Sequence, residues 1–118
     1  MDGKLKVSDY MVREVVSIPP DYTVREAINK LIATEFHGLP VEKDRRILGF
    51  VTAKELLRNI DRPDAKITEI IKPGTISLSP GMDIDDASRV LFRYGLRNAP
   101  VLDEDGMVVG MLSNIDII

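Results

Sequence analysis

The chain has 118 residues, 44% of them hydrophobic and 30% charged, with a formal net charge of −3. This length predicts one compact domain, and the absence of a basic stripe argues against nucleic acid as a partner. The sequence contains no run of about 18 apolar residues, so it predicts no membrane span. The N-terminus lacks the apolar core of a signal peptide.

The chain has no cysteine and a single histidine. These counts exclude disulfides, thiolate metal sites and zinc sites with several histidines. A site that binds an ion through carboxylates alone is left open. The absence of cysteine fits a cytoplasmic protein, and we expect that location. We assign no metal site.

The first half of the chain predicts a short helix, a strand, a helix, two strands and a last helix. In order, these are expected at about residues 7–11, 15–18, 24–36, 39–41, 47–51 and 53–59. Thr23 and Glu26 have the spacing of a capping box, and Gly38 can end the helix before it in a left-handed conformation. Thr52 is placed to cap the last helix. The short helix from Val7 to Met11 is expected to cross onto the neighbouring half.

The second half predicts the same elements again. In order, they are expected at about residues 67–71, 75–78, 84–94, 99–102 and 107–112, followed by a helix that begins at Ser113. Asp83 is placed to cap the helix after it, and Gly95 can end that helix. Between the halves, residues 61–66 form a polar linker in which Pro63 prevents a continuous helix.

The two halves are an internal repeat. Leu39-Pro40-Val41 returns as Ala99-Pro100-Val101 after 60 residues, and Gly49-Phe50-Val51-Thr52 returns as Gly110-Met111-Leu112-Ser113 after 61 residues. One half of about 50 residues would bury too little to fold alone. We therefore predict an α+β or α/β fold in which two β-α-β-β-α halves, 7–60 and 67–118, are related by an approximate twofold and pack through their sheets. The last helix is expected to be truncated.

These two ordered copies, with their Pro-Val strands and Gly-h-h-Thr/Ser-x-x-acid motifs (h, hydrophobic), resemble a tandem pair of CBS domains, often called a Bateman module. The resemblance covers residues 7–118. It implies a regulatory module that is not an enzyme, has no catalytic cofactor, and binds an adenosine-containing ligand such as AMP, ADP, ATP or S-adenosylmethionine between its repeats. It also implies a homodimer whose output goes to an effector protein or to a missing effector domain. The alternative is a ligand-free dimerisation or scaffold module.

The resemblance assigns a main cleft to the second copy of the motif. There, Asp116 would bind the ribose hydroxyls and Ser113 would contact ribose or phosphate, with His37 near the phosphate. The other candidate residues would form the adenine pocket and its surroundings: Val15, Val16, Gly38, Leu39, Pro40, Gly110 and Met111.

A second, weaker cleft is assigned to the first copy, because Glu55 stands where the family pattern has aspartate. Its other candidate residues are Gly49, Thr52, Thr75, Ile76, Arg97, Ala99 and Pro100, with Arg97 near the phosphate. Both motifs are also helix-capping patterns. We expect Asp116 to be a ribose ligand and Glu55 to serve as a cap. Arg97 has an alternative as a solvated surface residue, and His37 as a partner of a helix C-terminus.

Overall fold

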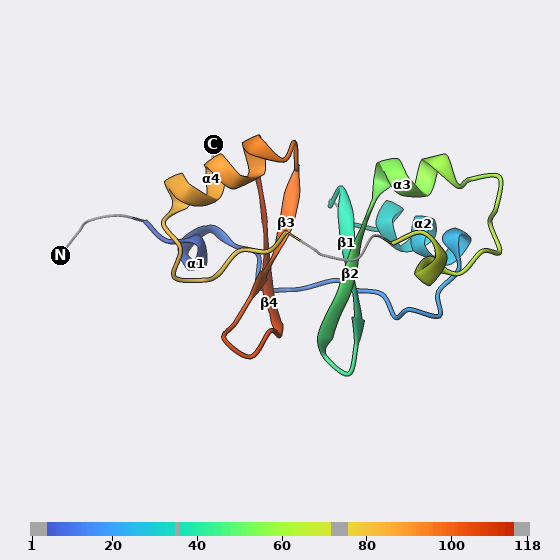
Figure 1. Ribbon diagram of the computed structural model, residues 1–118, viewed down its shortest axis with the longest axis horizontal. Coiled ribbons are helices and arrows are strands. Elements are labelled where there is room, and N and C mark those ends of the chain that lie inside the picture. Colours follow the sequence, from blue (N-terminus) through green and yellow to red (C-terminus); the bar gives the residue numbers. More distant parts are fainter. Residues whose placement is uncertain (1–4, 35, 72–75, 115–118) are drawn as a thin grey trace. The chain divides into compact units, whose positions relative to one another are not determined.

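The computed structural model describes residues 5–34, 36–71 and 76–114 (Figure 1). The chain divides into two compact units, each described here by itself. The continuous unit comprises Val16–Thr75, and the split unit combines Met1–Val15 with Ile76–Ile118. Within the described ranges, no helix is both long enough and apolar enough to cross a membrane.

The continuous unit is one antiparallel hairpin with helices beside it. Its elements are α2 (Val24–Ile32), β1 (Gly38–Lys43), β2 (Arg46–Thr52), α3 (Ala53–Arg58) and the 3-10 helix η1 (Ile67–Glu69). Ile18 forms a parallel bridge to Val41 and so extends the β1–β2 sheet by one short pairing. The buried core of this unit is Ile18, Val24, Ala27, Leu39, Val41, Val51, Leu56 and Ile67.

The split unit repeats this architecture. Its elements are α1 (Val7–Tyr10), α4 (Ile84–Arg93), β3 (Asn98–Leu102) and β4 (Val108–Ser113). Leu78 bridges Val101 in parallel, as Ile18 bridges Val41. The buried core is Val7, Met11, Leu78, Ala87, Leu91, Ala99, Val101 and Leu112. The predicted strand–helix–strand–strand order is confirmed in both halves, with each first strand reduced to a single bridged residue.

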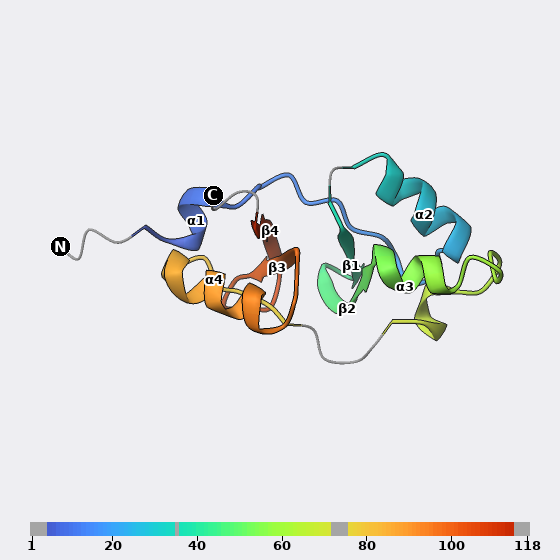
Figure 2. The same cartoon turned by 90° about the horizontal axis from the view of Figure 1, so that it is seen from above.

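The two halves of the sequence exchange their short helical segments. The backbone N–H of Val7 in α1 donates to the carbonyl of Met82 at 2.9 Å, and the N–H of Ile67 in η1 donates to the carbonyl of Tyr22 at 2.8 Å. Helix α1 therefore belongs with α4 of the second half (Figure 2), whereas η1 belongs with α2 of the first half. The expectation that the segment from Val7 crosses onto the other half is confirmed.

Helix α2 begins as predicted and ends early. The Thr23 N–H donates to Glu26 Oε1 at 3.0 Å, and the Glu26 N–H donates to Thr23 Oγ1 at 3.2 Å, so the capping box is confirmed. The helix ends at Ile32, and Gly38 does not end it in a left-handed conformation, as we had predicted, but opens β1. Glycine is needed there because a Cβ would lie 2.6 Å from Cε1 of Phe50.

For helix α4, the predicted end is confirmed and the predicted N-terminal cap is wrong. Gly95 follows it with a φ of 63°, as predicted for a glycine that ends a helix. Asp83 occupies the N-cap position, but its side chain makes no capping hydrogen bond. Its Oδ1 atom lies 2.6 Å from the Nζ of Lys6, so the predicted cap is wrong and the carboxylate forms an ion pair instead.

The inserted residue of the second half lies in a hairpin turn, as predicted. The β1–β2 turn is short, and both Asp44 and Arg45 have positive φ values. In the longer β3–β4 turn, Asp103 Oδ1 accepts from the N–H groups of Asp105 at 2.9 Å and Met107 at 3.0 Å. The extra residue therefore lengthens the loop and leaves the flanking strands in register.

Candidate functional site

Each unit places a hydroxyl-bearing residue where its last strand ends. Thr52 is the last residue of β2 and the N-cap of α3, and its hydroxyl accepts from the N–H of Glu55 at 3.2 Å. Ser113 is the last residue of β4. Both residues are partly exposed. The predicted cap at Thr52 is confirmed, and the predicted role of the Glu55 side chain stays a prediction.

A basic residue lies beside each of these strand ends. The N–H of Ala53 donates to the carbonyl of His37, and the N–H of Asn114 donates to the carbonyl of Arg97, both at 2.9 Å. The strand pairing explains both contacts, because the residue after each basic residue pairs with the hydroxyl residue: Gly38 with Thr52, and Asn98 with Ser113.

Within each unit, this pairing differs from the grouping made from the sequence. Sequence reasoning set His37 with Ser113 and Arg97 with Thr52. Within the units, the structure brings the backbone of His37 to Thr52 and that of Arg97 to Ser113. The grouping of His37 with Ser113 and of Arg97 with Thr52 stays a prediction. The repeat itself contained this information, since each basic residue precedes a strand that pairs with the strand ending in threonine or serine.

The side chains proposed as walls belong mainly to the cores. Leu39 and Ala99 are buried members of the two core clusters. The carbonyl of Pro40 accepts from the N–H of Ile18, and that of Pro100 accepts from the N–H of Leu78, both at 3.0 Å. These four residues therefore stabilise the units themselves.

The remaining candidate residues differ in exposure. Val15, Val16 and Ile76 are partly exposed. Gly49 is buried in β2. Thr75 and Asp116 lie outside the described residues.

Gly110 and Met111 have a structural role that the sequence did not reveal. The backbones of Met111 and Val12 exchange two hydrogen bonds of 2.8 and 2.9 Å. This contact brings the N-terminal segment so close to β4 that a Cβ on Gly110 would lie 2.7 Å from Sδ of Met11 and 3.0 Å from the carbonyl oxygen of Val12. The Met111 side chain is fully buried. Packing of residues 11 and 12 is thus sufficient to explain glycine at position 110.

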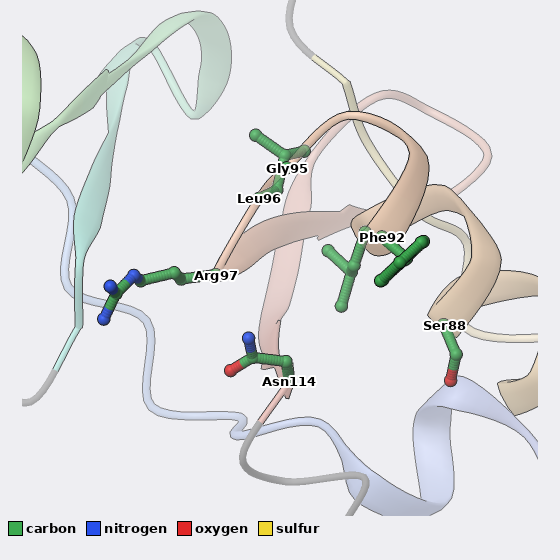
Figure 3. A pocket seen from close by; sticks show the side chains of 7 residues that line it. Ser88, Phe92, Gly95, Leu96, Arg97 and Asn114 are labelled. Atoms are coloured by element: carbon green, nitrogen blue, oxygen red, sulfur yellow. The ribbon is translucent and has the colours of Figure 1, made fainter.

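A hollow of about 470 Å³ lies within the split unit beside α4 (Figure 3). Its lining residues are Ser88, Leu91, Phe92, Gly95, Leu96, Arg97 and Asn114. Phe92 is 90% exposed, and the Arg97 side chain extends away from the hollow. Sequence reasoning did not identify this hollow. No group of side chains suited to hold a metal ion was found in the described ranges.

Comparison with known proteins defines the class of protein. The family model of the CBS domain matches this chain twice, over residues 7–62 and 67–118. The chain therefore belongs to the CBS domain family, and it carries two CBS domains in tandem.

The sequence relatives are longer proteins. The chain is 31% identical over 114 residues to an uncharacterised protein of Methanocaldococcus jannaschii, a match that covers 97% of this chain and 43% of that protein. It is 27% identical over 108 residues to inosine-5′-monophosphate dehydrogenase of Thermoplasma acidophilum, covering 92% of this chain and 22% of the enzyme. The chain thus spans less than half of the length of either relative.

Solved structures share the fold over almost the whole chain. A CBS domain pair in complex with 5′-methylthioadenosine and S-adenosyl-L-methionine matches with a TM-score of 0.89 at 21% identity, covering 97% of this chain and 93% of that chain. The protein CBSX2 in complex with AMP matches with a TM-score of 0.84 at 25% identity, covering 95% of this chain and 92% of that chain. These matches confirm the predicted fold of the two repeats.

Proposed function

We propose that this chain is a regulatory module that binds an adenosine-containing ligand, with AMP, ADP, ATP and S-adenosylmethionine as the candidates. Membership in the CBS family and the similarity to CBSX2 in complex with AMP support the proposal. One observation carries it. Both units bring a basic residue and a hydroxyl residue to the same point of the backbone, His37 with Thr52 and Arg97 with Ser113.

This pairing suits a phosphorylated ligand. A hydroxyl can donate to a phosphate oxygen, and an arginine or a protonated histidine adds charge-assisted hydrogen bonds. Each strand end has only one of the two basic residues, which favours a monophosphate over a triphosphate.

Asp116 remains our candidate for the ribose. It follows Ser113 by three residues, and a carboxylate can accept hydrogen bonds from two vicinal hydroxyls at once. Glu55 holds the matching place after Thr52, but its side chain is one methylene longer and loses more rotamer freedom when it is fixed. The copy with Asp116 is therefore proposed as the stronger site, and the copy with Glu55 as the weaker one.

The module has no catalytic step in this proposal. Ligand binding would change the state of an effector, either a separate protein or a domain elsewhere in a longer chain. The relatives that extend far beyond the matched region are consistent with an attached effector.

Isothermal titration calorimetry and thermal melting test the proposal with AMP, ADP, ATP, S-adenosylmethionine, methylthioadenosine and NADH. A ligand present at 100 times its dissociation constant should stabilise the wild type by about 2.7 kcal/mol. Asp116→Ala should abolish tight binding, whereas Glu55→Ala, the matched change in the other repeat, should preserve it. A wild-type chain whose melting temperature moves with none of these ligands would refute the proposal.

Exposed apolar side chains favour the second candidate function, association with a second copy. Ile32 and Leu57 of the continuous unit are 77% and 63% exposed. A contiguous exposed apolar patch marks an interaction site, and these two residues are candidates for one because their helices α2 and α3 are in contact. A homodimer should appear by light scattering and should be weakened by Ile32→Ser combined with Leu57→Ser. A wild type that stays monomeric at high concentration would exclude this association.

A further inference from the structure

The turn between β1 and β2 has an unfavourable sequence for its conformation. Asp44 and Arg45 are its two central residues, and both have positive φ values, 54° and 67°. A two-residue hairpin turn of this kind favours asparagine or aspartate followed by glycine. Aspartate fits this preference, whereas an arginine in the second position is uncommon, because its Cβ is crowded in the left-handed region. The chain thus holds an arginine where glycine would be more stable.

The matching turn of the second repeat has a glycine at a left-handed position. Gly106 lies in the turn between β3 and β4 and has a φ of 79°. The other residues of that turn, Asp103, Glu104 and Asp105, are acidic. The two turns therefore differ in backbone strain and in charge, although they join corresponding strands. A strained residue at one of two such turns is an indication of function rather than of folding.

The strained turn is basic and exposed. Lys43, Arg45 and Arg46 lie around a single acidic residue, Asp44, and all four are exposed. The side chains of Lys43 and Arg45 form no hydrogen bond or ion pair with any residue that the structure describes. Stability therefore does not explain Arg45, because its backbone is strained and its guanidinium group gains no contact within the described parts of the chain.

An exposed leucine lies next to the basic turn. The register of the β1–β2 pair shifts, so that Leu48 lies between the paired residues Ile47 and Gly49 and has no partner of its own on β1. Such a bulge can turn a side chain in a new direction, and Leu48 is 44% exposed. The end of the hairpin therefore offers an apolar side chain close to its cations. Arginine is enriched at protein–protein interfaces, so this end of the hairpin has the character of a contact surface.

The turn is remote from the proposed ligand site of its unit. It lies at one end of the β1–β2 hairpin, whereas α3 and the backbone contact of His37 lie at the other end (Figure 1). The six residues of β1 separate the two ends by roughly 20 Å. A partner that binds at the turn would therefore leave the strand end at Thr52 accessible to a small ligand.

We propose that this basic turn is a contact point for an acidic segment of the effector protein, with Arg45 as its principal contact. The inference rests on the proposed function, because it assumes that the module acts on an effector. An arginine can bind a carboxylate through two parallel hydrogen bonds. Lys43 and Arg46 add positive charge, which accelerates the encounter with an acidic partner. The chain has a net charge of −3, which favours a short acidic protein segment over nucleic acid or a membrane surface.

A first experiment tests whether the chain retains Arg45 although it lowers stability. Arg45→Gly should raise the melting temperature by about 2–8 °C, because glycine adopts the left-handed conformation freely. Gly106→Arg is the reverse change in the turn of the other repeat, and it should lower the melting temperature. Arg45→Ala keeps a Cβ and should melt close to wild type. An Arg45→Gly variant that is no more stable than wild type would overturn the proposal, because no strain would then need an explanation.

A second experiment measures the contact itself. The probe is a fluorescein-labelled peptide in which six glutamates surround one leucine, and fluorescence anisotropy follows its binding to the full chain. The wild type should bind the peptide at low salt and more weakly as salt is added. Arg45→Gly should weaken binding roughly fivefold, about the most that one exposed ion pair contributes.

The control variant is Arg58→Gln, which removes an exposed positive charge from α3 of the same unit. It should bind the peptide as the wild type does. Equal binding by wild type and Arg45→Gly would overturn the proposal, and so would the absence of binding at low salt. Vesicles with phosphatidylserine and a single-stranded oligonucleotide decide the class of partner. Tighter binding to either of them, lost in Arg45→Gly, would overturn the acidic protein segment as the partner.

Titration with AMP separates this inference from the proposed function. Arg45→Gly should bind AMP with the affinity of the wild type, because the turn lies at the far end of the hairpin from Thr52. A wild type that binds the peptide but none of the adenosine-containing ligands would refute the proposed ligand and support the contact at the turn. A wild type that binds AMP but not the peptide would refute the contact at the turn alone.

Discussion

Gly110→Ala tests whether the N-terminal segment determines the residue at position 110. The new methyl group would lie 2.7 Å from Sδ of Met11 and 3.0 Å from the carbonyl oxygen of Val12. The contact with Sδ is shorter than a Cβ tolerates, and the contact with the carbonyl oxygen is tighter than most Cβ contacts in proteins. The methionine side chain can rotate away, but the Val12 carbonyl is held by its hydrogen bond with the N–H of Met111.

The loss of stability follows from the fixed position of the Val12 carbonyl. Overpacking of a core by one methyl group typically costs about 1–3 kcal/mol. For a chain of this length that corresponds to a melting temperature lower by about 4–12 °C. The assay is urea unfolding followed by circular dichroism, together with a thermal melt of the same samples.

Two further variants make the result specific. Gly81→Ala is the matched control, because a Cβ at Gly81 meets nothing within 4 Å, and it should leave stability unchanged or raise it by up to about 1 kcal/mol. Met11→Ala combined with Gly110→Ala should cost less than the sum of the single changes, because the smaller side chain relieves the clash. A Gly110→Ala variant as stable as Gly81→Ala would show that residues 11 and 12 do not constrain this glycine.

Three other substitutions test separate parts of the fold. Leu56→Ala should lower the free energy of unfolding by about 2–5 kcal/mol, because it leaves a cavity in the core. Leu57→Ala, at an exposed position, should stay within about 0.5 kcal/mol of wild type. Equal losses for the two variants in urea unfolding would contradict the packing described. Thr23→Ala should cost about 0.5–2 kcal/mol by removing the cap of α2, and a thermal melt identical to wild type would argue against the cap. Asp83→Asn should lower the free energy of unfolding by less than about 1 kcal/mol, since the ion pair of Asp83 with Lys6 is partly exposed. This loss should become smaller as salt is added. A loss that does not depend on salt would mean that the ion pair is not its cause.

Local sequence patterns predicted the features that depend on near neighbours. The capping box of Thr23 and Glu26 needs only three residues of spacing, and the glycine after α4 needs only the end of a helix. The repeat also supplied the order of the elements, because each pattern occurs twice. These predictions were confirmed because the features depend on residues that are close together in the sequence.

Features that depend on distant contacts were not predicted. The carboxylate of Asp83 pairs with Lys6, which is 77 residues away in the sequence, and no local pattern shows that competition with the cap. Gly38 is required by the ring of Phe50 on the neighbouring strand. Strand pairing within each unit also brings the backbone of His37 to Thr52, a contact that the sequence did not reveal, whereas the grouping of His37 with Ser113 stays a prediction.

The exchange of α1 and η1 gives the chain an order of assembly during synthesis. Domains fold largely as units while the polypeptide grows from its N-terminus. All residues of the continuous unit, Val16–Thr75, have been made before the second strand pair is synthesised. Val7 and Met11 are made before this unit, but they are buried in one cluster with Leu112, which is made after it. Val7 and Met11 therefore stay exposed on the growing polypeptide while the continuous unit is made, until the second strand pair has been synthesised.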